Sequence, residues 1–221
     1  MEISGSKKRI LFIGLFVVPF LIAMALIFYG KGMGQLPKYY EEEITGKNGE
    51  KTKSYYSAPI EQFPSAFNDS LQSMSDSTTY VITFFPDSLK DRWDKHLLYI
   101  ERILVQHKGA RVASFFEEDS LGKVHWPTAD PQNFIAAQPL WQTFKVPEFQ
   151  WDKLYRDFKI SHAELDSMLY FPPYIIVDRQ RRIRSMVPVT GLKDVKEITG
   201  RLKRLNNEYA AVKKTIEQKE K

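Results

Sequence analysis

The sequence predicts an α/β domain with a central mixed sheet flanked by helices, preceded by an N-terminal transmembrane helix. Three patterns indicate this architecture. Residues 10–29 are apolar and free of charge. Two strand-like apolar runs, 80–85 and 110–116, enclose a helical pattern, and this order makes a right-handed parallel β-α-β unit. Residues 173–189 predict a β-hairpin, and a long helical pattern follows it.

The first predicted element is the apolar run at residues 10–29. Twenty uncharged residues in a helix span a hydrocarbon core of about 30 Å, and such a helix tolerates Pro19. Basic residues at 7–9 directly precede the run, so the positive-inside rule places residues 1–9 in the cytoplasm. We therefore expect a single-pass protein of the bacterial inner membrane whose domain lies in the periplasm.

A cleaved signal peptide is the alternative to this anchor. The tripeptide Ala23-Met24-Ala25 matches the small-residue pattern of a cleavage site. Residues 26–29 continue the apolar run beyond the tripeptide, which suits a spanning helix better. The sequence therefore favours an uncleaved anchor.

Residues 30–58 predict a linker and a short hairpin. Alternate glycines at 30–34 and then Pro37 indicate the linker, and Asn48-Gly49 between polar, strand-like flanks is a hairpin turn signal. The Ser-, Asp- and Asn-rich stretch at 59–79 then predicts a loop with room for one helical turn.

The main domain is predicted at residues 59–206, and its first α/β unit is the clearest part. After the strand at 80–85, Ser88 with Asp91 three residues later is a helix-start signature. A single apolar stripe then predicts a helix that ends near Gly109. The stripe consists of Leu89, Trp93, Leu97, Ile100 and Leu104.

The middle of the domain is less regular. Residues 117–138 predict irregular chain with at most a short helix, and 140–146 alternate like a strand. Pro147 begins a predicted helix, and Ser161 with Glu164 begins another. The apolar positions of the first of these helices are Phe149, Leu154 and Phe158.

The C-terminal third predicts a hairpin, with strands at 173–178 and 183–189, and a helix from about Leu192. Residues up to 206 carry most of the apolar stripe of this helix, whereas 207–221 are mostly charged and predict a helical extension. The stripe consists of Val195, Ile198, Leu202, Leu205, Tyr209, Val212 and Ile216.

Composition excludes several functions. The chain has no cysteine, which excludes disulfides, thiolate metal sites and thiol nucleophiles. Its net charge of +5 lies at its ends, because residues 1–9 carry +2 and residues 193–221 carry +4. A nucleic-acid-binding protein would carry this excess on the folded domain, so we expect no nucleic-acid partner.

The order of elements is that of a thioredoxin-like fold, and particular segments resemble one family with that fold. The segment "YIIVDRQRRIRSMVPVTGLKDVKEITGRLKRL", residues 174–205, is similar to the last strands and closing helix of the Sco/SenC/PrrC family. The segments "TTYVITFFPDSLKDRW" and "LPKYY" resemble the copper-binding loop and the opening of the same proteins. These are membrane-anchored, copper-binding assembly factors of cytochrome c oxidase.

The resemblance also identifies what this chain lacks. In the family, two cysteines of a CxxxC loop and a distal histidine bind copper. The corresponding positions here are Ser88, Arg92 and Tyr170, so all three ligands are missing. We therefore expect no copper site, no redox cofactor and no enzymatic activity.

Other candidate side chains favour structural roles. The four histidines, His96, His107, His125 and His162, show no ligand spacing and are interpreted as surface or partly packed residues. Ser88 is interpreted as a helix cap rather than a nucleophile. Acidic residues at 87, 91 and 94 suit a solvated helix start, and a divalent cation there is the weaker alternative.

Two further predictions concern the hairpin. Arg179, Arg181, Arg182 and Arg184 form the densest basic cluster, which is either an exposed turn or a docking patch for an acidic partner or lipid headgroups. Pro172 stands before the strand, where thioredoxin-like folds keep a cis-proline.

Two functional hypotheses follow. The first is a non-catalytic, membrane-tethered scaffold that acts as an assembly or accessory factor of a respiratory cytochrome oxidase. The second is a periplasmic binding or envelope-interaction module that uses the same fold for an unrelated partner.

Overall fold

The computed structural model describes most of the chain, in two compact units, Met1–Gln35 and Leu36–Lys221. The described residues are 17–21, 36–45, 51–58, 62–67, 70–75, 77–126, 139–160 and 171–219. Within them, no helix has both the length and the apolar character needed to cross a bilayer. In the first unit residues 17–21 are helical, and the rest of the predicted anchor at 10–29 lies outside the described residues.

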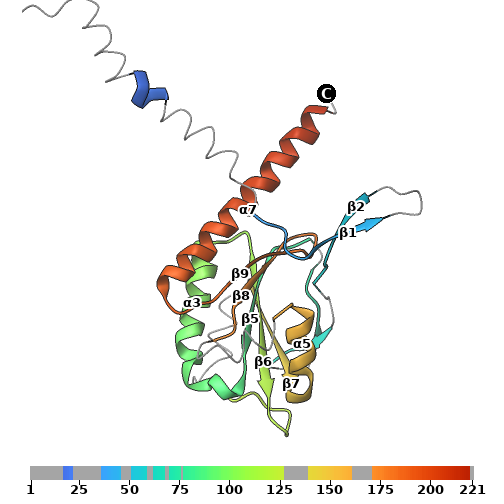
Figure 1. Ribbon diagram of the computed structural model, residues 1–221. Helices are drawn as coiled ribbons and strands as arrows, with labels where there is room; N and C mark the ends of the chain where they lie inside the picture. The colour runs from blue at the N-terminus through green and yellow to red at the C-terminus, as the bar shows by residue number, and fades with distance from the viewer. Residues whose placement is uncertain are drawn as a thin grey trace, which may run out of the picture. The chain divides into compact units, whose positions relative to one another are not determined.

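A five-stranded mixed sheet forms the centre of the second unit, in the order β7-β6-β5-β8-β9 (Figure 1). Strands β5, β6 and β7 are parallel, β8 runs antiparallel to β5, and β9 runs antiparallel to β8. All five strands fall within two residues of the predicted positions. Their bounds are Tyr80–Phe85, Arg111–Glu118, Trp141–Pro147, Tyr174–Val177 and Ile183–Val187.

Helices cover both faces of this sheet. The 3₁₀ helix η2 (Asp87–Arg92) leads directly into α3 (Trp93–Gln106). Helix α3 lies beside α7 (Leu192–Lys219) on one face, and α5 (Trp151–Asp157) lies on the other (Figure 1). The short η3 (Glu148–Gln150) precedes α5.

The core follows the two-residue period of the central strands. In β5, Val81 and Phe85 pack in the cluster below α3 and α7, whereas Ile82 and Phe84 pack in the cluster below α5. Every residue of β5 is buried, as expected for a central strand covered on both faces. Among the apolar positions predicted for the helix after Pro147, Phe149 is not buried, because it is 82% exposed.

Two small hairpins precede the sheet. Strands β1 (Glu41–Thr45) and β2 (Lys51–Tyr55) pair antiparallel, which confirms the predicted hairpin, although its turn at Asn48-Gly49 lies outside the described residues.

The second hairpin lies within the stretch 59–79, which was predicted as a loop. The described part of this stretch contains two short strands that the prediction did not include, β3 (Phe63–Pro64) and β4 (Leu71–Gln72), which pair antiparallel. The ring of Phe63 packs against Phe115 and Phe144, at centroid distances of 5.1 and 5.9 Å. Ser65 also forms an antiparallel bridge with Phe144, so the segment lies beside β7, an edge strand of the sheet.

Candidate functional site

The loop after β5 holds two of the positions at which the resemblance expects copper ligands. Ser88 and Arg92 are both exposed on η2, four residues apart. The third position, Tyr170, lies outside the described residues. Its neighbour Phe171 packs against Phe85 at the end of β5, with ring centroids 5.3 Å apart. The chain before β8 therefore reaches the same end of the sheet as the loop.

Ser88 does not begin the helix as predicted. Pro86, in an extended conformation, occupies the N-cap position, and no side chain caps the helix there. The carboxylate of Glu117 accepts a hydrogen bond from the backbone N–H of Asp87 at 2.6 Å. This acceptor comes from the neighbouring strand β6, and Ser88 is exposed to solvent.

Glu117 is a functional candidate that the sequence interpretation missed. Partial burial raises the pKa of its carboxyl, and the negative charges of Glu148 and Asp87 raise it further, against the lowering effect of the Asp87 N–H. The available signal was its position just after the apolar part of β6. Parallel strands bring their carboxyl ends to one edge, where Glu117 meets the end of β5.

Trp93, the first residue of α3, holds the loop against the core. Its indole Nε1 donates a hydrogen bond to the carbonyl of Pro86 at 3.1 Å, and the backbone N–H of Leu89 donates to the same oxygen at 3.0 Å. The Trp93 ring is fully buried against Phe85 and Phe116. The loop therefore rests on an aromatic floor of buried rings, and two hydrogen bonds to the Pro86 carbonyl define its shape.

His96 lies one helical turn beyond this floor and is buried. Its ring stacks on Phe171, and its Nδ1 lies 3.0 Å from the hydroxyl of Tyr174. Burial first, then the positive charges of Lys95 and Arg92, lower the pKa of His96 to about 3. The imidazole is therefore neutral and packed, in agreement with the structural role predicted for it.

The described residues contain no group of three or more His, Cys, Asp or Glu side chains arranged to hold a metal ion. Asp87 instead lies 3.7 Å from the ammonium group of Lys90. The arrangement at the loop can therefore position a partner through hydrogen bonds and charges, but it gathers no metal-ligand set in the described part of the chain.

The predicted arginine patch is only partly exposed. Arg184 is 1% exposed, and its guanidinium donates to Asp178 at 3.1 Å and to Glu208 at 2.6 Å. Burial alone would lower the pKa of Arg184, but these two carboxylates raise it overall. The interpretation of Arg184 as part of a docking patch is therefore wrong, because its side chain is buried and pairs with Asp178 and with the half-buried Glu208.

The other three arginines surround the turn. Arg182 donates to Asp178 at 2.8 Å, and Arg179 lies over the ring of Tyr209 at 4.7 Å. Arg179 is exposed, whereas Arg181 and Arg182 are half-buried. The cluster therefore serves mainly to close the β8–β9 turn.

The proline prediction also needs correction. No peptide bond among the described residues is cis, so the bonds that precede Pro172 and Pro173 are trans. A trans bond is the lower-energy isomer before proline, by about 0.5–1 kcal/mol.

Comparison with known proteins identifies solved structures with a similar fold. No protein-family profile matches the sequence, and no curated protein is significantly similar to it. BsSco, a member of the Sco family of cytochrome c oxidase assembly proteins, superposes with a TM-score of 0.50 at 12% identity, over 69% of this chain and 95% of that one. A SCO1/SenC family lipoprotein from Bacillus anthracis gives the same TM-score and identity, over 69% and 96% of the two chains.

A third solved structure, a putative thiol:disulfide interchange protein DsbE from Chlorobium tepidum, superposes with a TM-score of 0.48 at 15% identity, over 68% of this chain and 96% of that one. At these identities the two Sco structures show the fold alone. The chain therefore has a thioredoxin-like α/β fold, similar to that of Sco proteins, and carries no cysteine in it.

Proposed function

We propose that this protein is a membrane-tethered, non-catalytic scaffold with a Sco-like fold, which serves assembly of a respiratory oxidase. The observation that carries the proposal is the loop after β5 in a chain without cysteine. The Glu117 carboxylate and the Pro86 carbonyl hold this loop in shape. A shaped loop without thiols suits recognition better than redox or copper chemistry.

The chemistry of the loop side chains supports this view. Ser88 offers a hydroxyl, which is a poor ligand for soft Cu(I), and Arg92 offers a guanidinium, which stays protonated and repels a cation. Both side chains are exposed, so a protein partner can contact them. The proposal is that the loop kept its contact surface while the thiol chemistry was lost.

The membrane tether is part of the proposal. Its support is the uncharged run at residues 10–29 behind the basic residues 7–9. Protease added to spheroplasts is expected to digest the domain and to leave a small anchored fragment. A domain that stays protected in intact spheroplasts would rule out the periplasmic location.

The oxidase partner rests on the likeness to BsSco, which is described as a member of a family of cytochrome c oxidase assembly proteins. The described part of α7 offers a surface for such a partner, because Val212 and Ile216 are 57% and 52% exposed. With Tyr209, they line a groove beside the β8–β9 turn.

Affinity capture from membranes tests the proposal. Full-length tagged protein, purified in mild detergent, is expected to retain oxidase subunits. Two variants make the result specific to surfaces: Ser88→Glu with Arg92→Glu alters the loop, and Val212→Ser with Ile216→Ser alters the groove. Capture of envelope proteins without any oxidase subunit would favour the alternative function, an envelope-interaction module.

A further inference from the structure

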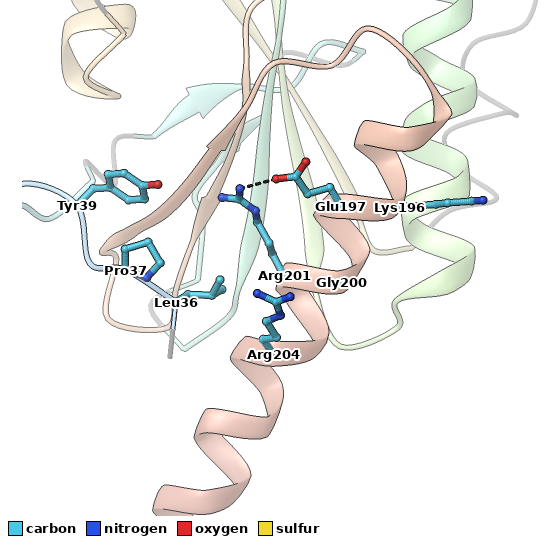
Figure 2. A pocket seen from close by; sticks show the side chains of 8 residues that line it. All are labelled: Leu36, Pro37, Tyr39, Lys196, Glu197, Gly200, Arg201 and Arg204. Atoms are coloured by element: carbon cyan, nitrogen blue, oxygen red, sulfur yellow. Dashed lines mark hydrogen bonds and ion pairs between the residues drawn. The ribbon is translucent and has the colours of Figure 1, made fainter. Parts of the chain in front are cut away.

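A hollow of about 490 Å³ lies between α7 and the segment that leads into the domain at Leu36 (Figure 2). Both walls belong to the second compact unit. The hollow is distinct from the loop after β5 and from the arginines of the hairpin turn. Its lining includes Leu36, Pro37, Lys196, Arg201 and Arg204, together with one carboxylate, that of Glu197.

Two guanidinium groups dominate this hollow. Arg201 and Arg204 lie three residues apart on α7, and Figure 2 shows both on the side of the helix that faces Leu36, whereas Lys196 extends away. Like charges at this helical spacing repel each other. Arg201 is paired with Glu197 and donates to the hydroxyl of Ser185 at 2.5 Å.

The guanidinium of Arg204 has a different environment. Among the described residues, no hydrogen bond or ion pair engages its side chain, and the residue is exposed. A bound anion would offset the repulsion between the two arginines and provide the acceptor that Arg204 lacks. Guanidinium groups bind phosphate in a planar, two-point geometry.

Hydrogen bonds engage the backbone of the opposite wall at Leu36 and Pro37. The backbone carbonyls of Leu36 and Pro37 both accept hydrogen bonds from Arg184, at 2.8 and 3.2 Å. The backbone N–H of Leu36 donates to Glu208 at 2.5 Å. Leu36 is 5% exposed, so this wall is held in place before any ligand binds.

The covalent chain links this hollow to the proposed anchor, and the inference rests on that anchor. Leu36 follows residue 29 by seven residues, which span at most about 25 Å when fully extended. Such a short tether gives a local lipid concentration on the order of millimolar or more, so even a weak site fills. We propose that Arg201 and Arg204 bind the phosphate headgroup of an anionic phospholipid and thereby orient the domain on the membrane.

Energy transfer from the protein to lipid tests this proposal. Because the chain has no cysteine, Lys203→Cys gives one labelling site on exposed α7. The labelled full-length chain is reconstituted into nanodiscs of phosphatidylcholine, with or without phosphatidylglycerol, that contain an acceptor-labelled headgroup. We expect more transfer with phosphatidylglycerol, and suppression of that gain by high salt.

Arg204→Gln is the decisive variant, because replacing this guanidinium removes no hydrogen bond or ion pair to another described residue. The ratio of docked to undocked protein is expected to fall about tenfold, as for one charge-assisted hydrogen bond. Lys214→Gln removes the same charge from an exposed position further along α7 and should leave the ratio nearly unchanged. Arg201→Gln should also lower it, with circular dichroism as the check on folding.

Four results would overturn the inference. Equal transfer in both lipids, with the chain still resistant to alkaline extraction, would reject the lipid site and keep the anchor. An equal effect of Lys214→Gln would mean non-specific charge attraction. Loss of the lipid dependence in low-millimolar inorganic phosphate would identify a site for free phosphate. Release of the chain by alkaline extraction would reject the anchor, and the inference with it.

Discussion

The imidazole of His96 lies flat against the ring of Phe171, with ring centroids 3.6 Å apart and planes inclined by 13°. The stack joins α3 to the chain that enters β8, two segments far apart in the sequence. It lies beside the loop after β5, because Phe171 also packs on Phe85. Any charge placed on His96 would therefore act on the place where the loop meets the sheet.

Acid should destabilise the domain through His96. Its pKa is about 3 in the fold and 6.5 when unperturbed, so the unfolded chain binds the proton first. The contribution of neutral His96 to the free energy of unfolding is fully present above pH 6.5. It is lost as the pH drops from 6.5 towards 3, by a total on the order of 4 kcal/mol. In His96→Gln this loss should be absent from urea denaturation curves measured across that range.

His125→Gln is the matched control for this measurement. His125 is exposed and takes no part in the stack of His96 on Phe171, so its replacement should leave the fall in stability that His96 causes in place. Identical pH profiles for the wild type and His96→Gln would contradict the buried, neutral state of His96.

Glu117 should act in the opposite direction. Its pKa is raised above 4.5, chiefly by burial, so the folded state holds the proton more tightly than the unfolded chain. Its contribution to stability is therefore greatest below pH 4.5 and declines as the pH rises through the raised pKa.

The variant Glu117→Gln tests this sign. The amide oxygen can still accept from the Asp87 N–H, while the charge disappears. The variant should gain stability relative to the wild type at pH 7, and the gain should shrink as the pH approaches 4.5. A variant that is less stable at pH 7 would show that the loop needs the carboxylate charge.

Trp93→Ala should destabilise the domain by about 3–5 kcal/mol, because a fully buried ring is lost together with its hydrogen bond to Pro86. Phe149→Ala is the control, since an 82% exposed ring should cost no more than about 0.5 kcal/mol. Equilibrium denaturation measures both. A cost below about 1 kcal/mol for Trp93→Ala would mean that the aromatic floor contributes little.

The comparison of these two aromatic residues shows what the sequence could predict. The position of Trp93 was predictable because the buried stripe of α3 repeats over several turns. Phe149 was misassigned because the short η3 and α5 offer too few residues for a period to average out. A 3₁₀ turn before α5 also changes the angle at which each side chain leaves the axis.

The loop was less predictable than the sheet. A local capping rule assigned the helix start to Ser88, but the acceptor that serves the loop comes from Glu117, 30 residues away in the sequence. Arg184 was assigned to the surface for a similar reason, because its acidic partner Glu208 lies on another element. Local patterns record strands and helices well, whereas paired charges between elements need the register of the fold.

Two C-terminal truncations should separate the parts of α7. Although the sequence places Glu208 and Tyr209 in a charged extension, Glu208 pairs with buried Arg184 and Tyr209 accepts from the N–H of Arg179 at 3.1 Å. Deletion of residues 207–221 should therefore cost about 3–5 kcal/mol, as for a buried ion pair that loses one partner.

Deletion of residues 211–221 is the matched control. Its described residues are exposed, so the loss in stability should be small, while capture of partners through the groove should fall. Equal melting temperatures for the two truncations would show that the Arg184–Glu208 pair contributes little.

The wild-type domain should neither bind Cu(I) tightly nor reduce disulfides. A copper site of the Sco kind needs two thiolates and an imidazole, and the corresponding side chains here are a hydroxyl, a guanidinium and a phenol. Competition with a chromophoric Cu(I) chelator measures this directly. Stoichiometric binding by the wild type would contradict the proposed non-catalytic role.

A variant with restored ligands complements this test, because it is expected to gain copper binding. The variant Ser88→Cys, Arg92→Cys and Tyr170→His places all three ligand types at the corresponding positions, and it should gain one Cu(I) per chain. The control keeps Tyr170→His but moves the thiols to Lys90→Cys and Asp94→Cys, exposed positions with the same four-residue spacing.

The comparison of the two variants decides how far the loop has kept its shape. Binding by the first and not the second would mean that Glu117, Pro86 and Trp93 hold η2 in a copper-competent geometry. Equal binding by both would mean that any exposed pair of thiols suffices. Failure of the first to bind would show that the loop has changed in shape as well as in chemistry, because the correct donor atoms in a preserved geometry would bind Cu(I).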